Sequence, residues 1–317
     1  MGMKKVSEQQ KSGIKFLGYG ATGTGKTLFG LSAPAIASMD TEDGQVFYMR
    51  HPVLGKNLLY REVTNSVKDV EDVLDEVENE LIDEVKTLLI DSETKLYENL
   101  QHVQLNIAEE RARKAKRDSD AEGLSVKEWG KIKQVTKRIQ NSKIILASKG
   151  INIISIAQES DLKEKSGENW VVIGHKPEVA KGLEFDYDVI LRFFTKDVME
   201  KGKKIVKYFA EVIKDRTNTY QKGDTVENPN FDLWSKAYAI GQGGVEGVLN
   251  FRDSETKDVE VFSAQEKIDG IVKQIKAMVG DPVKMAILSE LAKNGKIPKD
   301  FLFASVEQAQ AILNELV

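Results

Sequence analysis

The run from Gly20 to Thr27, GATGTGKT, follows the pattern of a phosphate-binding loop. Glycine accepts unusual backbone dihedrals, so the N–H groups of such a loop can all face one phosphate. Lys26 would supply a positive charge to the β- and γ-phosphates, and the Thr27 hydroxyl would ligate Mg²⁺. The pattern therefore predicts that ATP and Mg²⁺ bind at Gly20, Ala21, Thr22, Gly23, Thr24, Gly25, Lys26, Thr27 and Leu28.

Three further polar residues lie at or just past the ends of apolar segments. Asp91 ends the segment Lys86–Ile90, where a carboxylate can hold Mg²⁺, although it could instead cap the next helix. Glu42 follows Ala35–Met39 and could orient a water for attack on the γ-phosphate, or be a solvated turn residue. Gln158 closes Ile151–Ala157 and could contact the γ-phosphate or be an ordinary polar strand end.

The elements that must position these residues alternate between strands and helices. Residues 14–19, 35–39, 86–91 and 151–157 are typical of buried strands. Helices are expected from Lys26 to Ser32 and over about 67–81, 94–117 and 125–148. This alternation predicts an α/β fold with a mainly parallel sheet flanked by helices. Ligands bind such sheets at the carboxyl ends of the strands, where the candidate residues fall.

The remaining chain is expected to add a hairpin and a helical region. Residues 159–169 are polar without periodicity, and 187–194 and 205–213 predict two strands joined at Lys201-Gly202-Lys203. Four glycines between 241 and 247 place a boundary there. The predicted domains are an ATPase core, 1–240, and a small, mostly helical accessory region, 241–317.

The order of these motifs resembles the RecA-like P-loop ATPases over about residues 14–222. Asp40-Thr41-Glu42 is similar to the family's catalytic-glutamate sequence, Asp91-Ser92 to its Walker B end, and Gln158 to its sensor glutamine. The size and Glu128-Trp129-Gly130 look most like the phage Sak-type single-strand annealing proteins, also described as phage nucleotide-binding proteins.

The resemblance implies further residues and partners. Lys214 and Arg216 resemble the basic pair that reaches the ATP of a neighbouring subunit, which implies a homo-oligomer, a ring or short filament. Two loops would bind single-stranded DNA, one between Asp91 and Gln158 and one after Gln158. The basic residues in these regions are Arg111, Arg113, Lys114, Lys116, Arg117, Lys163 and Lys165; the first five could equally form a solvated helix face paired with neighbouring glutamates.

Composition narrows the class of protein. The net charge is −4, and the sequence has no cysteine, which excludes disulfides, thiolate metal sites and cysteine nucleophiles. The three histidines lack metal-ligand spacing. No signal peptide or apolar run suggests a membrane, so a cytoplasmic protein of a bacterial cell, encoded by a phage, is expected.

The sequence-based hypothesis is an ATPase that binds single-stranded DNA and promotes annealing or strand exchange. Glu42, Lys26, Gln158, Lys214 and Arg216 would be its catalytic residues, with Thr27 and Asp91 at the metal. A ring-forming helicase or translocase and an ATP-gated, non-catalytic binding module remain alternatives, and a small-molecule kinase is a fourth. The C-terminal helices could dock a single-strand-binding protein.

Overall fold

The computed structural model describes residues 10–118, 123–200, 202–244, 251–298 and 301–316. The chain divides into two compact units, Met1–Leu249 and Asn250–Val317. That these units act as an ATPase core and an accessory region stays a prediction. Within the described residues, no helix is both long enough and apolar enough to cross a membrane.

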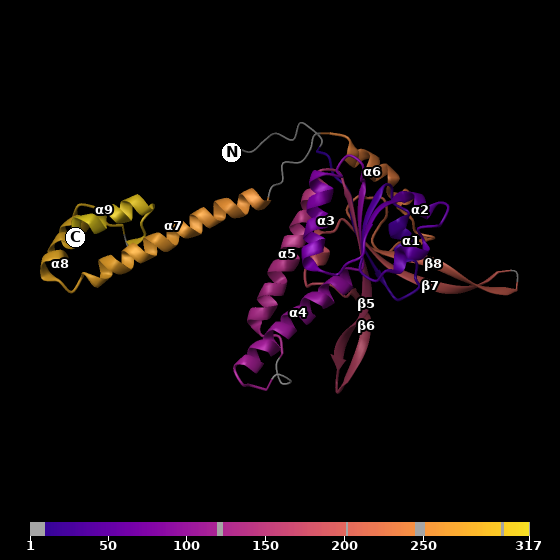
Figure 1. Cartoon of the computed structure of the whole chain (residues 1–317), viewed down its shortest axis with the longest axis horizontal. Helices are drawn as coiled ribbons and strands as arrows, with labels where there is room; N and C mark the ends of the chain where they lie inside the picture. The colour runs from indigo at the N-terminus through magenta and orange to yellow at the C-terminus, as the bar shows by residue number, and fades with distance from the viewer. Residues whose placement is uncertain (1–9, 119–122, 201, 245–250, 299–300, 317) are drawn as a thin grey trace. The chain divides into compact units, whose positions relative to one another are not determined.

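A nine-stranded sheet forms the centre of the first unit (Figure 1). Its strands run in the order β3-β2-β4-β5-β1-β7-β8-β9, with β6 paired to β5 outside this path. The first six in that order are parallel, and β8 and β9 are antiparallel to their neighbours. The bounds are Lys15–Gly20 (β1), Ile36–Asp40 (β2), Leu58–Glu62 (β3), Thr87–Asp91 (β4), Asn152–Ser166 (β5), Asn169–Pro177 (β6), Val189–Glu200 (β7), Lys203–Asp215 (β8) and Thr225–Glu227 (β9).

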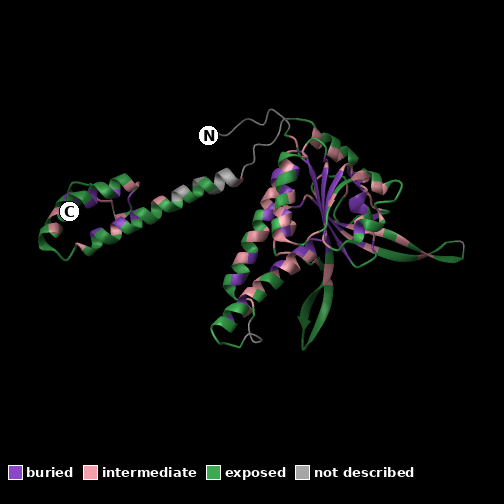
Figure 2. Ribbon diagram, viewed as in Figure 1, coloured by how far each residue is buried: buried purple, intermediate pink, exposed green. Residues whose placement is uncertain are grey.

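Helices cover both faces of this sheet, as expected from the unbroken apolar strands. The helices of the unit are Lys26–Leu31 (α1), Leu54–Asn57 (α2), Val67–Asn79 (α3), Glu93–Lys114 (α4), Val126–Ser148 (α5) and Ser235–Gln242 (α6); short 3₁₀ turns span Gly44–Phe47, Leu183–Asp186 (η2) and Phe231–Trp234. In β4, Leu88 and Ile90 face the α3–α5 side, whereas Leu89 packs with Phe29 of α1. Figure 2 shows the strands as the buried centre. The predicted α/β class is therefore confirmed.

Capping side chains fix where the two long helices begin. Ser92 precedes α4, and its hydroxyl accepts a hydrogen bond from the Lys95 N–H. Ser125 precedes α5, and with Glu128 it forms a reciprocal capping box. Because Ser92 directly follows Asp91, helix α4 starts at the same sheet edge at which β4 ends.

The interval 159–169 corrects a sequence-based expectation. It was expected to lack regular structure, with Gln158 closing its strand, but β5 continues through Gln158 to Ser166 and pairs antiparallel with β6. Residues 161–170 are all exposed. A two-stranded ribbon with no buried face needs no alternation of apolar side chains, so the sequence carries no periodic signal there. The predicted hairpin of β7 and β8 is present and longer than expected.

The second unit packs three helices around its own core. They span Phe251–Ala277 (α7), Pro282–Lys293 (α8) and Val306–Leu316 (α9). Buried residues from all three, including Ile275, Leu291 and Ile312, make up this core. The mostly helical C-terminal region expected from the sequence is confirmed.

Candidate functional site

A cavity of about 480 Å³ lies at the carboxyl edge of the parallel sheet, next to the glycine-rich loop. All the predicted cofactor-binding residues, Gly20 to Leu28, line it. The sheet register explains why distant residues meet there: Gly20 pairs with Gln158, and Asp40 pairs with Asp91. The pairing of neighbouring strands therefore places these residues level with one another at the sheet edge that carries the cavity.

The glycine-rich loop depends on backbone conformations that favour glycine. Gly25 has φ +91°, and a Cβ added there would lie 3.3 Å from the Tyr208 ring. Both the dihedral and the close approach therefore oppose any larger residue. This conformation carries the chain directly into Lys26, the first residue of α1.

Lys26 is held inside the loop by the loop's own carbonyl groups. Its Nζ donates to the oxygens of Gly20 at 2.9 Å and Ala21 at 2.7 Å. Burial lowers the pKa of Lys26, and the nearby Asp91, Glu159 and Glu42 carboxylates oppose that effect. Phosphate oxygens are stronger acceptors for an ammonium than neutral carbonyls are, so the position suits a bound polyphosphate.

Asp91 and Thr27 form the oxygen pair expected of a magnesium site. The Thr27 hydroxyl donates to Asp91 Oδ2 at 2.7 Å. Burial raises the pKa of Asp91 to about 6, although the hydrogen bond from Thr27 lowers it. A hydroxyl and a carboxylate are ligand types that Mg²⁺ takes, and a cation beside the buried carboxylate would favour its charged form. The donor set therefore fits Mg²⁺.

Glu42 lies in the cavity wall and is oriented by the residue after Asp91. Ser92 Oγ donates to Glu42 Oε1 at 3.0 Å. The segment is held further by Thr41, whose N–H donates to the Asp91 carbonyl at 2.7 Å and whose Oγ1 accepts from the Ser92 N–H at 2.7 Å. These bonds fix the carboxylate of Glu42 relative to the carboxylate of Asp91.

Asp40, by contrast, has a structural role. It is buried and forms a 2.7 Å ion pair with Arg61 on β3. Its carboxylate also accepts the backbone N–H groups of Gly44 and Gln45. Asp40 thereby shapes the turn that carries Glu42. Of the two carboxylates in Asp40-Thr41-Glu42, that of Glu42 lines the cavity.

Gln158 also lines the cavity, at the point where β5 leaves the sheet. Its side chain is exposed, while its backbone is bonded to neighbouring elements. The structure thus brings Lys26, Thr27, Glu42, Asp91 and Gln158 together, although they lie in or just after four different strands.

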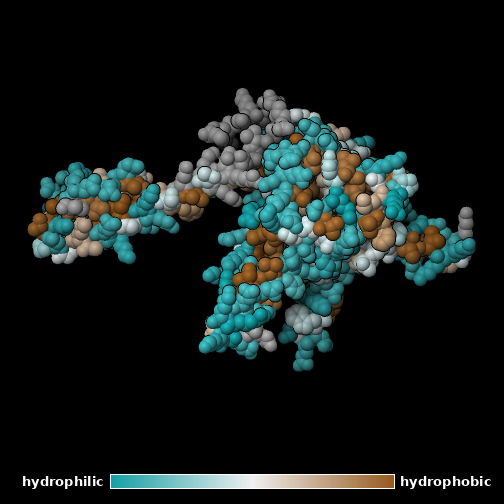
Figure 3. All heavy atoms as spheres, in the orientation of Figure 1, coloured by the Kyte–Doolittle hydropathy of each residue, from teal (hydrophilic) through white to brown (hydrophobic). Residues whose placement is uncertain are grey.

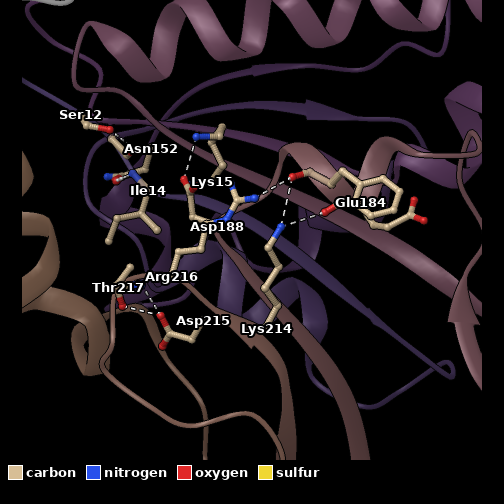
Figure 4. Close-up of polar contacts among 12 residues, drawn as sticks. Ser12, Ile14, Lys15, Asn152, Glu184, Asp188, Lys214, Asp215, Arg216 and Thr217 are labelled. Atoms are coloured by element: carbon tan, nitrogen blue, oxygen red, sulfur yellow. Dashed lines mark hydrogen bonds and ion pairs between the residues drawn. The ribbon is translucent and has the colours of Figure 1, made fainter.

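Lys214 and Arg216 lie at the opposite edge of the sheet from this cavity. Asp215, which lies between them in the sequence, pairs with Val189, and Val189 pairs with Phe16 near the start of β1. The glycine-rich loop instead follows the end of β1. The distance along β1 from Phe16 to Gly20 implies a separation of roughly 13 Å. Figure 4 shows Lys214 donating to the Glu184 and Phe185 carbonyls. Neither residue lines the cavity of its own subunit.

The basic residues suggested for DNA lie on two exposed hairpins. In the helical hairpin α4–α5, Arg113 pairs with Glu109 of its own helix, as the solvated-face alternative expected, whereas Arg111 pairs with Glu128 of α5. Lys114 and Lys116 are exposed. Arg117 also has a partner. Hydrophilic residues dominate the visible tip of this hairpin in Figure 3. Lys163 and Lys165 are exposed on β5.

Several residues that line the cavity belong to none of the sequence motifs. Tyr208 of β8 and Tyr48 both line it, as does Glu159, which pairs with Arg192 at 3.0 Å. Tyr208 reaches the loop because β8 pairs with β7, which pairs with β1. That proximity follows from tertiary pairing, so no local pattern around Tyr208 could have revealed it.

Comparisons with known proteins give a family match and a structural likeness. No curated protein matches the chain significantly. The crystal structure of the RadB recombinase is similar over 69% of this chain and 87% of that one, with 16% sequence identity and a TM-score of 0.43. A likeness at this level carries no inference about activity. The model of the AAA domain family matches residues 12–223, the part that contains every strand of the sheet except β9 and every residue that lines the cavity. On this match the chain belongs to the AAA domain family.

Proposed function

We propose that this protein is a DNA-recombination ATPase that binds single-stranded DNA in its ATP-bound state and promotes annealing, as in the phage single-strand annealing type. The observation that carries the ATPase part is the convergence of Lys26, Glu42 and Asp91 on one cavity. A lysine for the phosphates, a carboxylate for the metal and a second carboxylate for the water are the groups that phosphoryl transfer needs.

Each residue has a defined part in hydrolysis. The loop N–H groups and Lys26 bind the β- and γ-phosphates, and Thr27 and Asp91 would hold Mg²⁺. The metal, when bound, neutralises charge on the phosphate oxygens. Glu42, oriented by Ser92, accepts a proton from the attacking water, and the amide of Gln158 contacts the γ-phosphate.

The proposal that the protein binds DNA is supported by the position of the hairpin β5–β6, which begins at the cavity. Gln158 and Glu159 line the cavity, and the exposed Lys163 and Lys165 follow on the same strand. The exposed ring of Trp170 lies across from Lys165 in the ribbon. Cations beside an accessible aromatic ring suit single strands, because the phosphates are neutralised while a base stacks.

Measuring ATP hydrolysis with and without single-stranded DNA over a salt series tests this function. We expect DNA to stimulate hydrolysis and salt to remove the stimulation steeply, since the released counterions set the binding free energy. Annealing of complementary strands without unwinding should accompany it. Hydrolysis that ignores DNA at every salt concentration would contradict the proposal, and ATP-driven strand separation would favour a helicase instead.

Lys214 and Arg216 are proposed to act on the ATP of a neighbouring copy of this chain. Asp188 lies 3.7 Å from the Arg216 guanidinium and 2.7 Å from Lys15, so the pair stays at the sheet edge away from its own cavity (Figure 4). Burial and then the charge of Arg216 lower the pKa of Lys214. A phosphate from a neighbour would relieve that repulsion between the two cations.

Mixing two inactive variants tests action between subunits. Arg216→Ala should lower hydrolysis by about 10³-fold or more, the effect typical of an arginine supplied to a phosphoryl group. Lys26→Ala is inactive at its own cavity but keeps Arg216. An equimolar mixture should recover part of the wild-type rate, because some cavities are then complete. A mixture no more active than its two components would contradict action in trans.

A further inference from the structure

The buried hydroxyl of Thr94 makes two hydrogen bonds at the root of the hairpin β5–β6. Thr94 lies in the first turn of α4 and is 0% exposed. Its Oγ1 accepts the backbone N–H of Gln158 at 2.9 Å and donates to the carbonyl oxygen of Glu178 at 2.8 Å. A hydroxyl group is small and can both donate and accept a hydrogen bond, so this one side chain holds two separate backbone segments.

These two backbone groups belong to the two legs of the hairpin. Gln158 is the last residue of β5 that pairs with β1, and Glu178 directly follows β6. The first pair of the ribbon, Glu159 with Pro177, lies just beyond them. The legs also bond each other, because the Glu178 N–H donates to the Gln158 carbonyl at 2.8 Å. Thr94 therefore holds the hairpin where it leaves the sheet.

Thr94 lies close in sequence to Asp91, the residue at the end of β4 that is proposed to bind the metal. Thr94 is separated from Asp91 only by Ser92 and Glu93, and Ser92 orients Glu42. The side chain of Gln158 is exposed in the cavity and has no hydrogen-bond partner among the residues that the structure describes, so its backbone sets the direction in which its amide points. Thr94 supplies that fixed point and ties it to the same turn that positions Glu42.

We propose that Thr94 is a positioning residue, which holds the backbone of Gln158 so that its amide faces the γ-phosphate and transmits that contact to the hairpin β5–β6. The inference rests on the proposed ATPase function and names how the cavity is coupled to the hairpin. The plainer alternative is that Thr94 only satisfies a buried N–H and a buried carbonyl.

Two substitutions separate the hydroxyl from the shape of the side chain. Thr94→Val replaces the hydroxyl by a methyl group, and Thr94→Ser keeps the hydroxyl. We expect Thr94→Val to lower kcat about 10- to 100-fold, the scale of a misplaced catalytic contact, with KM changed less than about twofold. Thr94→Ser should restore kcat. The matched control is Thr136→Val, because, in the described part of the chain, Thr136 Oγ1 bonds only carbonyls of its own helix.

The double variant with Gln158→Ala decides whether Thr94 acts through Gln158. If it does, adding Thr94→Val to Gln158→Ala should lower kcat no further, since the contact is already absent. Losses that multiply in the double variant would overturn the proposal. Should Thr94→Val fail to fold, Thr94→Cys takes its place, because a thiol is only a weak donor and acceptor. The outcomes keep the same meaning.

Hydrogen exchange of the full chain gives a readout that does not depend on turnover. With ATPγS and Mg²⁺, we expect slower exchange in 20–28 and in 158–178 of the wild-type protein. In Thr94→Val, protection of 20–28 should remain and that of 158–178 should be lost, whereas Thr94→Ser should keep both. Equal protection of 158–178 in the valine variant would overturn the role of Thr94 alone. Absence of protection at 20–28 in the wild-type protein would overturn the proposed function itself.

Discussion

Replacing Glu42 by glutamine should leave nucleotide affinity almost unchanged and lower the rate of ATP hydrolysis by about 10²- to 10⁴-fold. The amide keeps the size of the carboxyl group and can still accept the hydrogen bond from Ser92 Oγ. It cannot take a proton from water. Affinity is measured by titration with a fluorescent ATP analogue, and the rate by phosphate release.

The matched control for Glu42→Gln is Asp43→Asn. Asp43 lies next to Glu42, is exposed, and is ion-paired with Arg61. It does not line the cavity, so this change should leave the rate within about twofold, as surface substitutions usually do. Normal turnover by the Glu42→Gln variant would remove Glu42 from the mechanism.

Replacing Lys26 by alanine should abolish hydrolysis and weaken ATP binding by about 10- to 100-fold, the effect of losing a hydrogen bond from a charged donor. The folded chain should survive the change, because, among the described residues, the Nζ bonds only the Gly20 and Ala21 carbonyls of its own loop. In the absence of ligand, the unfolding temperature of the variant should therefore be close to that of the wild-type protein.

Thermal unfolding with and without ATP and Mg²⁺ checks this expectation. Ligand that binds only the folded state raises the unfolding temperature. The wild-type protein should show that rise, and Lys26→Ala should show little of it at the same ATP concentration. Lys56→Ala is the control, since Lys56 is an exposed lysine of α2 away from the cavity. An unchanged rise in Lys26→Ala would show that ATP binds elsewhere.

The residues that the sequence singled out line one cavity because each lies beside a strong local signal. Asp91 ends the apolar strand β4, and Lys26 follows a strand and a glycine-rich turn. In a parallel sheet, strand order alone then brings such ends to one edge. The same reasoning gave the helices α4 and α5, whose starts are marked by Ser92 and Ser125.

The rest of the site depends on contacts that no local pattern encodes. Tyr208 meets Gly25 only through the pairing of β8 with β7 and of β7 with β1. The ribbon β5–β6 has no buried face, so its strands lack the alternation by which strands are recognised. The hydroxyl of Thr94 has significance only once the backbone of Gln158 lies beside it.

A high-resolution structure of the chain with ATPγS and Mg²⁺ tests the central claim most directly. We expect the β-phosphate within hydrogen-bonding distance of the loop N–H groups and of Lys26, and the metal beside Thr27 with Asp91 close to it. Glu42 should lie within reach of a water facing the γ-phosphate. A triphosphate bound away from residues 20–28, or Glu42 turned away from the γ-phosphate with no water between them, would contradict the account.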